Sequence, residues 1–174
     1  CCGKELCNGC VYASVEADNR CLCPYCRAPA PSSEEETIKR MKKRADVGDA
    51  IAIYNLGGLY LNGFMGLPLD RNKGMELFLR AGELGNAAGY YNLGNTYHYG
   101  RGVGRDMEKA KYYYELGAMG GDVHARLNLG WLEYRAGNMS RAMKHWMIAA
   151  GAGLDEALKN IKKGYSNGYL CNKR

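Results

Sequence analysis

The chain has 174 residues, 47% of them hydrophobic and 24% charged, with a formal net charge of +6. This composition is typical of a folded protein, and no apolar run approaches the ~18 residues that a membrane-spanning helix requires. The positive charge gathers in residues 39–44 and 159–174. Such short clusters are typical of solvated helix faces, whereas a nucleic-acid interface needs a longer basic stripe with interleaved aromatic residues. We therefore expect neither a membrane nor nucleic acid as a partner.

Both ends of the sequence indicate a piece of a longer protein. The first residue is Cys1 rather than methionine, and the last residues stand where a loop to another helix is expected. No secretory leader is visible. The total number of structural repeats in the parent protein is therefore left open.

The N-terminal segment is rich in cysteine: seven of the eight cysteines lie within the first 26 residues. Cys7 and Cys10 form one Cys-x2-Cys pair, and Cys23 and Cys26 form another. Two such pairs supply the tetrahedral four-sulfur set that zinc prefers. Disulfides are the competing interpretation, but no export signal accompanies the cluster. We therefore predict zinc as a cofactor of residues 1–27 and an intracellular location, cytoplasmic or nuclear.

The finer cysteine spacing resembles the second half of a RING finger, in which Cys-Pro-x-Cys closes the motif. The resemblance implies two zinc ions bound crosswise. One zinc would be held by Cys2, Cys23 and Cys26. The other would be held by Cys7 and Cys10 together with a cysteine pair that this sequence lacks.

Two points leave the ligand set open. Lys4 stands where the RING family has a histidine, and an ammonium group is a poor zinc ligand. Cys1 and Cys21 are the candidates to replace it. A single zinc held by the two Cys-x2-Cys pairs is also compatible with the spacing.

A RING finger would make the parent protein a ubiquitin ligase. By this resemblance Pro24 would lie on the surface that docks a ubiquitin-conjugating enzyme, and Arg27 would bridge ubiquitin and its carrier. A rigid knuckle and an ordinary surface cation are the alternatives for these two residues. RING catalysis uses no nucleophile, because its rate gain comes from positioning and electrostatics. The sequence leaves open whether the parent is an enzyme.

A linker and a helix are expected to follow the cysteine-rich segment. Residues 28–33 contain two prolines and predict an extended link. Ser33-x-x-Glu36 matches a capping box. We expect the helix that it starts to cover residues 34–48 as a capping helix or half-repeat.

A four-residue sequence motif, called the word below, then recurs along the chain. Residues 54–57 and 91–94 both read Tyr-Asn-Leu-Gly, residues 127–130 read Leu-Asn-Leu-Gly, and residues 159–162 are a worn copy. Successive copies lie 37, 36 and 32 residues apart. A period in this range indicates stacked helix pairs. The expected repeats are residues 49–85, 86–121 and 122–153, with an incomplete fourth at 154–174.

The ends of these repeats carry the residues that stop and start helices. A glycine stands nine positions before the last residue of each word, at Gly48, Gly85, Gly121 and Gly153. After three of these glycines comes Asp49, Asn86 or Asp122. Glycine adopts the left-handed conformation that ends a helix, and Asp or Asn caps the next one.

The second helix of each repeat carries a stripe in which a large ring follows a small residue by four positions. The pairs are Gly74 with Phe78, Ala110 with Tyr114, and Ala142 with Trp146. We predict that the small residues let the paired helix come close and that the ring fills the space left. Glycine inside a helix is costly, so Gly57, Gly94 and Gly130 predict close helix contact at these positions.

This register resembles the Sel1-like repeat (SLR), a relative of the tetratricopeptide repeat, over about residues 45–169. The matching residues are Asn-Leu-Gly-x-x-Tyr, the loop from Gly100 to Asp106, and Lys109-Ala110. The resemblance implies an all-α fold, an α-solenoid of stacked antiparallel helix pairs. It also implies use as an adaptor or scaffold for other proteins.

In the related family the first helix of each pair lines a ligand-binding groove. Carried onto this chain, positions one, four and five after the repeat glycine predict a partner-binding groove. Its residues are Asn95, His98, Tyr99, Trp131, Tyr134, Arg135, Lys163 and Asn167. Aromatic residues with arginine are usual in binding hot spots. For Trp131 and Tyr134, packing between repeats is the alternative. The groove is neutral to basic, so an acidic or C-terminal peptide fits it.

No catalytic pattern is found in the repeats. The three glycines of residues 100–104 follow an expected helix rather than a strand, so they predict a loop and no phosphate cradle. The histidines are not spaced as a ligand set. The leading hypothesis is a non-enzymatic interaction scaffold with a zinc-binding RING-like N-terminus. The alternative is a RING-type ubiquitin ligase whose repeats recruit substrate.

Overall fold

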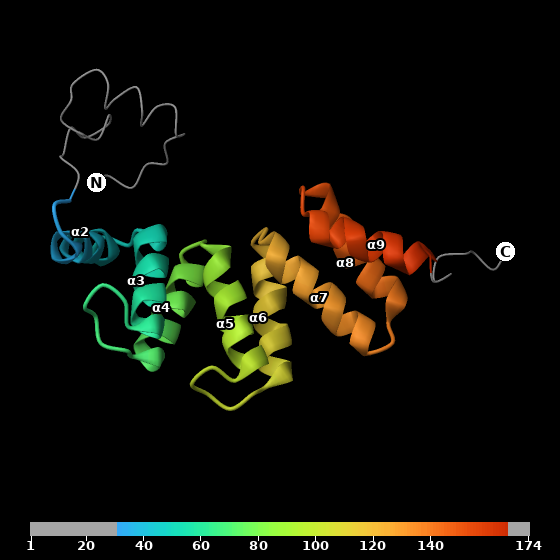
Figure 1. Ribbon diagram of the computed structural model, residues 1–174, viewed down its shortest axis with the longest axis horizontal. Coiled ribbons are helices and arrows are strands. Elements are labelled where there is room, and N and C mark those ends of the chain that lie inside the picture. The colour runs from blue at the N-terminus through green and yellow to red at the C-terminus, as the bar shows by residue number, and fades with distance from the viewer. Residues whose placement is uncertain (1–30, 167–174) are drawn as a thin grey trace, which may run out of the picture. The chain divides into compact units, whose positions relative to one another are not determined.

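The computed structural model describes residues 31–166, and within this range every regular element is an α-helix (Figure 1). The expected absence of a β-sheet is thus confirmed for these residues. The cysteines predicted to bind zinc lie outside the described range, and so do Pro24, Arg27 and Asn167. The helices are α2 (Glu34–Asp46), α3 (Ala50–Asn62), α4 (Arg71–Glu83), α5 (Ala87–Tyr99), α6 (Met107–Met119), α7 (Val123–Arg135), α8 (Met139–Gly151) and α9 (Asp155–Ser166).

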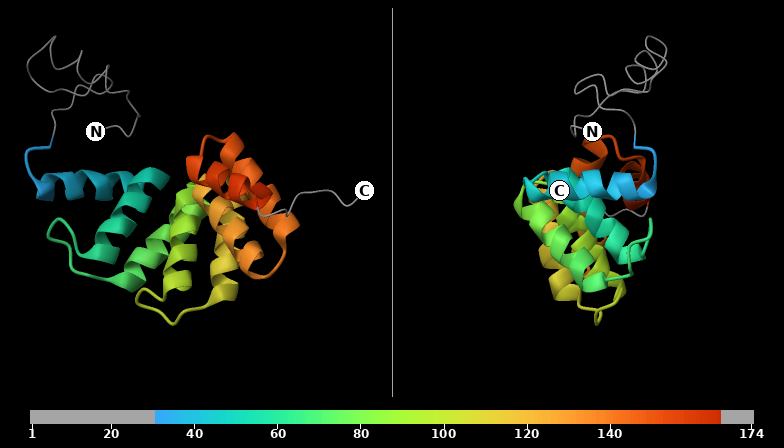
Figure 2. Two further views of the ribbon diagram at one scale, coloured as in Figure 1. Left: turned by 45° about the vertical axis from the view of Figure 1, so that its right-hand side comes forward. Right: turned by 90° about the vertical axis from the view of Figure 1, so that its left-hand side faces the viewer.

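The chain divides into two compact units, with the boundary between Arg80 and Ala81. In the first unit α2 packs on α3, and Phe78 of α4 lies against Tyr54 of α3 at a ring-centroid distance of 5.5 Å. In the second unit α6 packs against both α5 and α7, and α8 packs against both α7 and α9 (Figures 1 and 2). From α5 to α9, each helix of the second unit therefore packs on the next helix of that unit.

The start of α2 forms only half of the predicted capping box. Ser33 Oγ accepts a hydrogen bond from the Glu36 backbone N–H at 3.1 Å. The Glu36 carboxylate turns to Ser32 instead of Ser33, and accepts from its backbone N–H at 2.8 Å and its hydroxyl at 2.9 Å. These bonds, followed by an ion pair with Arg40, lower the pKa of Glu36 to about 2. Ser33 therefore still caps the helix, but the Glu36 carboxylate binds Ser32 in place of the Ser33 backbone.

The turns between repeats follow the expected chemistry at the glycines and at Asp122, but not at Asn86. The glycines that precede the second, third and fourth repeats, Gly85, Gly121 and Gly153, have φ of 92°, 92° and 91°. Asp122 accepts a hydrogen bond from the Ala125 N–H at 2.7 Å, as an N-cap residue does. Asn86 occupies the same position in α5 but makes no side-chain capping bond.

Close helix contact at the repeat glycines is confirmed, and the nearest atoms that meet them belong to aromatic rings of the second helix. A methyl group at Gly94 would lie 2.5 Å from Cδ1 and Cε1 of Tyr114, and one at Gly57 would lie 2.9 Å from Cδ1 of Phe78. At Gly130 it would collide with the indole of Trp146. Because a Cβ atom does not fit, glycine lets the two helices of each pair approach until the ring fills the gap.

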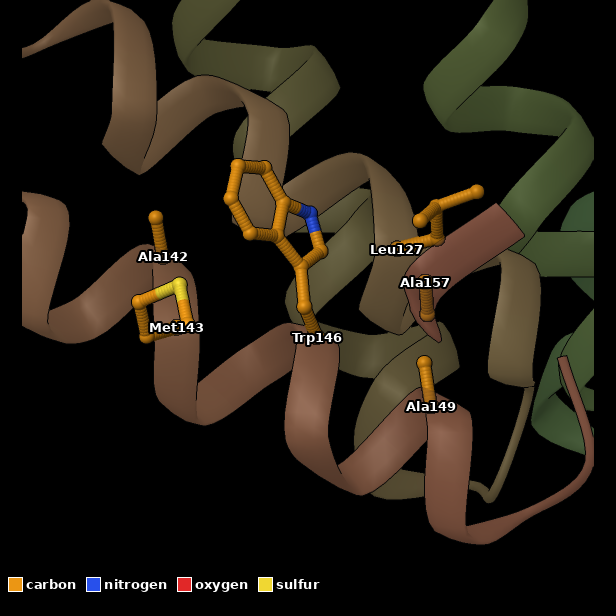
Figure 3. Packing of buried hydrophobic residues seen from close by; sticks show 6 residues of the cluster. All are labelled: Leu127, Ala142, Met143, Trp146, Ala149 and Ala157. Carbon is orange, nitrogen blue, oxygen red and sulfur yellow. The ribbon is translucent and has the colours of Figure 1, made fainter. Parts of the chain in front are cut away.

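The second unit contains two successive apolar clusters instead of one central core. One consists of Ala110, Tyr114, Ala118, Ala125 and Leu129, and the other of Leu127, Ala142, Met143, Trp146, Ala149 and Ala157. Helix α7 contributes to both. Figure 3 shows Trp146 among the small side chains of α8, with Leu127 of α7 and Ala157 of α9 nearby. Neighbouring helix pairs therefore bury each other's faces, which is the packing of a solenoid.

The loop inside the third repeat is short, because α7 ends at Arg135 and α8 begins at Met139. Asn138 takes the N-cap position, which draws Met139 and Ser140 into the first turn.

Candidate partner-binding site

One face of α7 lines two neighbouring pockets in the second unit. Asn128, Trp131, Leu132 and Arg135 occupy positions i, i+3, i+4 and i+7, so they share a face of the helix. Trp131 belongs to both pockets and forms a wall between them.

The first hollow, here called the aromatic pocket, has a volume of about 80 Å³. Trp131 meets Trp146 nearly edge-on, with centroids 5.3 Å apart, and meets Tyr134 at 5.7 Å and an interplanar angle of 87°. Such edge-to-face contacts are favourable for aromatic rings. The pocket is lined by Trp131, Tyr134, Met139, Trp146, Asn160, Lys163 and Gly164.

The second hollow, here called the polar pocket, has a volume of about 290 Å³. Its walls come from α5, α7 and α9, and they carry one arginine and one glutamate. The lining residues are His98, Tyr99, Asn128, Trp131, Leu132, Arg135 and Glu156.

His98 is a half-buried group at the α5 side of the polar pocket. Burial lowers its pKa, and the positive charges of Arg105 and Arg135 lower it further. The imidazole is therefore neutral near pH 7. Its Nδ1 atom has no hydrogen-bond partner among the residues that the structure describes. Tyr99 packs on this ring with centroids 4.7 Å apart, and Arg101 lies 5.0 Å above the Tyr99 ring.

Two buried donors in the walls of the aromatic pocket also have no partner in residues 31–166. They are Nε1 of Trp146 and Nδ2 of Asn160. The Trp146 Nε1 atom lies against Gly130 of α7, so it is enclosed between α7 and α8.

The structure brings together most of the residues predicted for the groove. His98, Tyr99, Trp131 and Arg135 line the polar pocket, and Tyr134 and Lys163 join Trp131 in the aromatic pocket. Tyr99 is 61% exposed and Tyr134 37%. These side chains are accessible to a partner.

Asn95 has a different environment from the other groove residues. Its Oδ1 accepts hydrogen bonds from Tyr114 Oη at 2.7 Å and from Asn128 Nδ2 at 3.3 Å. These bonds tie α5 to α6 and α7, so Asn95 orients the wall of the site from within. Burial raises the pKa of Tyr114 well above its usual value, which keeps its hydroxyl a donor.

Sequence reasoning missed several pocket residues, and for two of them the signal was present. Asn128 and Asn160 are the second residue of the repeated four-residue word, two positions before its end. In α7 and α9 this position lies on the same face as the residue after the word, Trp131 or Lys163. The other missed residues are Leu132, Met139, Trp146, Glu156 and Gly164.

Residues 31–166 contain no group of three or more His, Cys, Asp or Glu side chains placed to hold a metal ion. The zinc prediction concerns residues 1–27, which lie outside the described range. Across residues 31–166, each helix is too short or too polar to cross a bilayer.

Solved structures place this architecture in the SLR fold. A Sel1 repeat protein from Oxalobacter formigenes is 32% identical with a TM-score of 0.72, over 80% of this chain and 58% of that one. The protective antigen c5321 of uropathogenic Escherichia coli, which displays an SLR fold, is 31% identical with a TM-score of 0.68, over 75% of this chain and 29% of that one. The fold class is therefore an α-solenoid of the SLR type.

The repeats themselves match a known family model. Residues 50–86 and 87–122 match the family model of the Sel1 repeat. The repeat register predicted from the sequence is thus confirmed for residues 50–122. Sel1 repeat proteins bind other proteins and act as interaction scaffolds.

Two curated relatives are similar over much of this chain. Chitin synthase regulator SKT5 of Saccharomyces cerevisiae is 30% identical over 78% of this chain and 21% of its own length. The ERAD-associated E3 ubiquitin-protein ligase component HRD3B of Arabidopsis thaliana is 29% identical over 64% of this chain and 18% of its own length. The chain thus spans about a fifth of each of these relatives.

Proposed function

We propose that this chain is a non-catalytic adaptor that holds a segment of a partner protein against α5, α7 and α9. The observation that carries the proposal is the pair of adjacent pockets on either side of Trp131. Their walls combine exposed aromatic rings with Arg135 and Lys163. Aromatic side chains and arginine contribute most of the binding energy in protein interfaces.

The names of the relatives agree with such a role. One is a regulator of chitin synthase and the other a component of a ubiquitin ligase, so each is named for an association with an enzyme. Neither of the two pockets is lined by a serine, threonine or cysteine that could act as a nucleophile in covalent catalysis.

Replacing Trp131 with alanine should weaken peptide binding by tenfold or more, since the residue forms a wall of both pockets. The test is selection of a random displayed peptide library on the full chain, followed by titration of the selected peptides into wild type and Trp131→Ala. Circular dichroism should show unchanged helicity. Lost helicity would mean that Trp131 belongs to the core, and selected peptides that bind both proteins equally would contradict the proposal.

We further propose that the N-terminal cysteines bind zinc and that the parent protein takes part in ubiquitin transfer. The support is the spacing of the two Cys-x2-Cys pairs, together with the similarity to a ubiquitin-ligase component. In this proposal Pro24 and Arg27 contact a ubiquitin-conjugating enzyme while the repeats hold the substrate. Free thiols that bind zinc require a reducing compartment, so an intracellular location follows from the same proposal.

Native mass spectrometry of the chain purified with zinc should show roughly one metal ion per molecule, because two Cys-x2-Cys pairs complete one site. Substituting Cys23 and Cys26 with serine should abolish the added mass, whereas Cys171→Ser should leave it unchanged. A metal-free chain with its cysteines paired in disulfides would refute the zinc proposal. That result would leave the adaptor proposal intact, since it rests on other residues.

A further inference from the structure

The two pockets differ in chemistry although they share Trp131. The aromatic pocket offers three rings and Met139 to an apolar side chain. The polar pocket offers Arg135, the neutral imidazole of His98 and the amide of Asn128. A single bound segment that enters both must therefore present an apolar group and a polar group side by side.

The charged residues around the two pockets determine whether the polar group of the ligand is an anion or a cation. Arg135 lines the polar pocket, Arg105 lies close enough to act on His98, and Arg101 covers the adjacent Tyr99 ring. Lys163 lines the aromatic pocket. Within the two linings, the cations Arg135 and Lys163 stand against a single acidic residue, Glu156, and Arg101 and Arg105 lie beside the linings. The site as a whole therefore favours an anion.

We infer that the occupant is an extended, acidic segment of a partner protein that places an aliphatic side chain in the aromatic pocket and a glutamate carboxylate beside Arg135 in the polar pocket. This inference rests on the proposed adaptor function and names its ligand. In an extended chain, side chains on one face recur at every second residue. Because the pockets share a single wall residue, the expected motif is an aliphatic residue followed or preceded at the second position by glutamate.

The probes are short Gly/Ser peptides that are blocked at both ends, so that the tested side chain carries the only carboxylate. Four peptides are matched, with Leu-x-Glu, Leu-x-Gln, Leu-x-Lys or Ala-x-Glu at the centre, and the first is also made in reverse order. Each peptide is titrated into the full chain and binding is followed by NMR. One of the two peptides that contain both Leu and Glu should bind more tightly than all the others. The glutamine peptide should bind about three- to fivefold more weakly, as for a partly exposed ion pair. The lysine peptide should bind more weakly still.

Two variants that change the charge of the polar pocket in opposite directions add to the test. Arg135→Gln should remove the preference for glutamate over glutamine, whereas Glu156→Gln should increase it, because a competing carboxylate is lost. Arg141→Gln is the matched control: Arg141 is exposed and lines neither pocket, so the preference should stay unchanged. Equal binding of the four peptides, or a preference for lysine, would overturn the inference.

The outcome also separates the inference from the adaptor proposal. If the random library yields peptides that need Trp131 but lack an acidic residue, the adaptor function stands and the acidic motif is wrong. If the library yields no peptide that depends on Trp131, both are wrong.

Discussion

Replacing Trp146 with alanine should lower the free energy of unfolding by about 3–5 kcal/mol, the largest stability loss that we expect from one substitution in this chain. Trp146 is 2% exposed, and its ring occupies the space that Gly130 leaves on α7. The same ring borders Met143 and Ala157, so its removal opens a cavity among α7, α8 and α9 (Figure 3). Urea unfolding followed by far-ultraviolet circular dichroism measures the loss.

Met147→Ala is the matched control for this substitution. Met147 is the next residue of α8 and is 56% exposed, so its truncation should change stability by no more than about 0.5 kcal/mol. Similar losses of stability for Trp146→Ala and Met147→Ala would contradict the assignment of Trp146 to the buried face of α8 and Met147 to its exposed face. A repeat protein need not unfold in one step, so the slope of the transition should be compared as well.

The second prediction sets two neighbouring glycines against each other. Gly57→Ala should destabilise the chain by about 1–3 kcal/mol, because the added methyl group presses on the Phe78 ring and lies 3.1 Å from the backbone oxygen of Gly74. Gly58→Ala, one position later in α3, meets no atom within 4 Å. Since alanine is favoured over glycine inside a helix by about 1 kcal/mol, Gly58→Ala should stabilise by up to that amount.

Thermal and urea unfolding of the two variants would decide this prediction. The double variant Gly57→Ala with Phe78→Leu should lose less than the sum of its parts, because a smaller side chain relieves the collision. Equal effects of the two alanine substitutions would mean that close helix approach is not the reason for glycine in the repeated word.

Much of the fold was predictable because its determinants are local. The glycines that end helices and the aspartates that begin them act through neighbouring backbone groups, so Gly121 and Asp122 indicate a boundary wherever the chain folds. The repeat period adds long-range information, since it predicts close helix contact at the same position of every repeat. The contacts of Gly57, Gly94 and Gly130 confirm this.

The candidate site was predictable only in part. Spacing along α7 places Trp131 and Arg135 on one face of the helix, and the sequence shows that directly. It does not show that Met139, at the start of the next helix, reaches the aromatic pocket, because that depends on how the short loop turns the chain. It also does not show that Asn95 is engaged by Tyr114 and Asn128, because hydrogen bonds between helices depend on how far apart their axes lie.

Glu133 is a further example of what only packing reveals. It is 6% exposed, and its carboxylate pairs with Lys111 of α6 at 3.3 Å and accepts from Asn138 at 2.9 Å. Burial opposes its ionisation, but the hydrogen bonds from Asn138 and Lys111 outweigh this and lower the pKa. In the sequence Glu133 looks like any exposed glutamate of a helix.

The sequence by itself determined where the helices begin and end, which faces they bury, and that they come in repeated pairs, because capping, turn chemistry and periodicity act over a few residues. The tertiary structure decided which side chains from α5, α7, α8 and α9 gather around Trp131 and which polar atoms are left without partners. The reason is physical: a pocket is formed by the distance and rotation between helices, and no single helix contains that information.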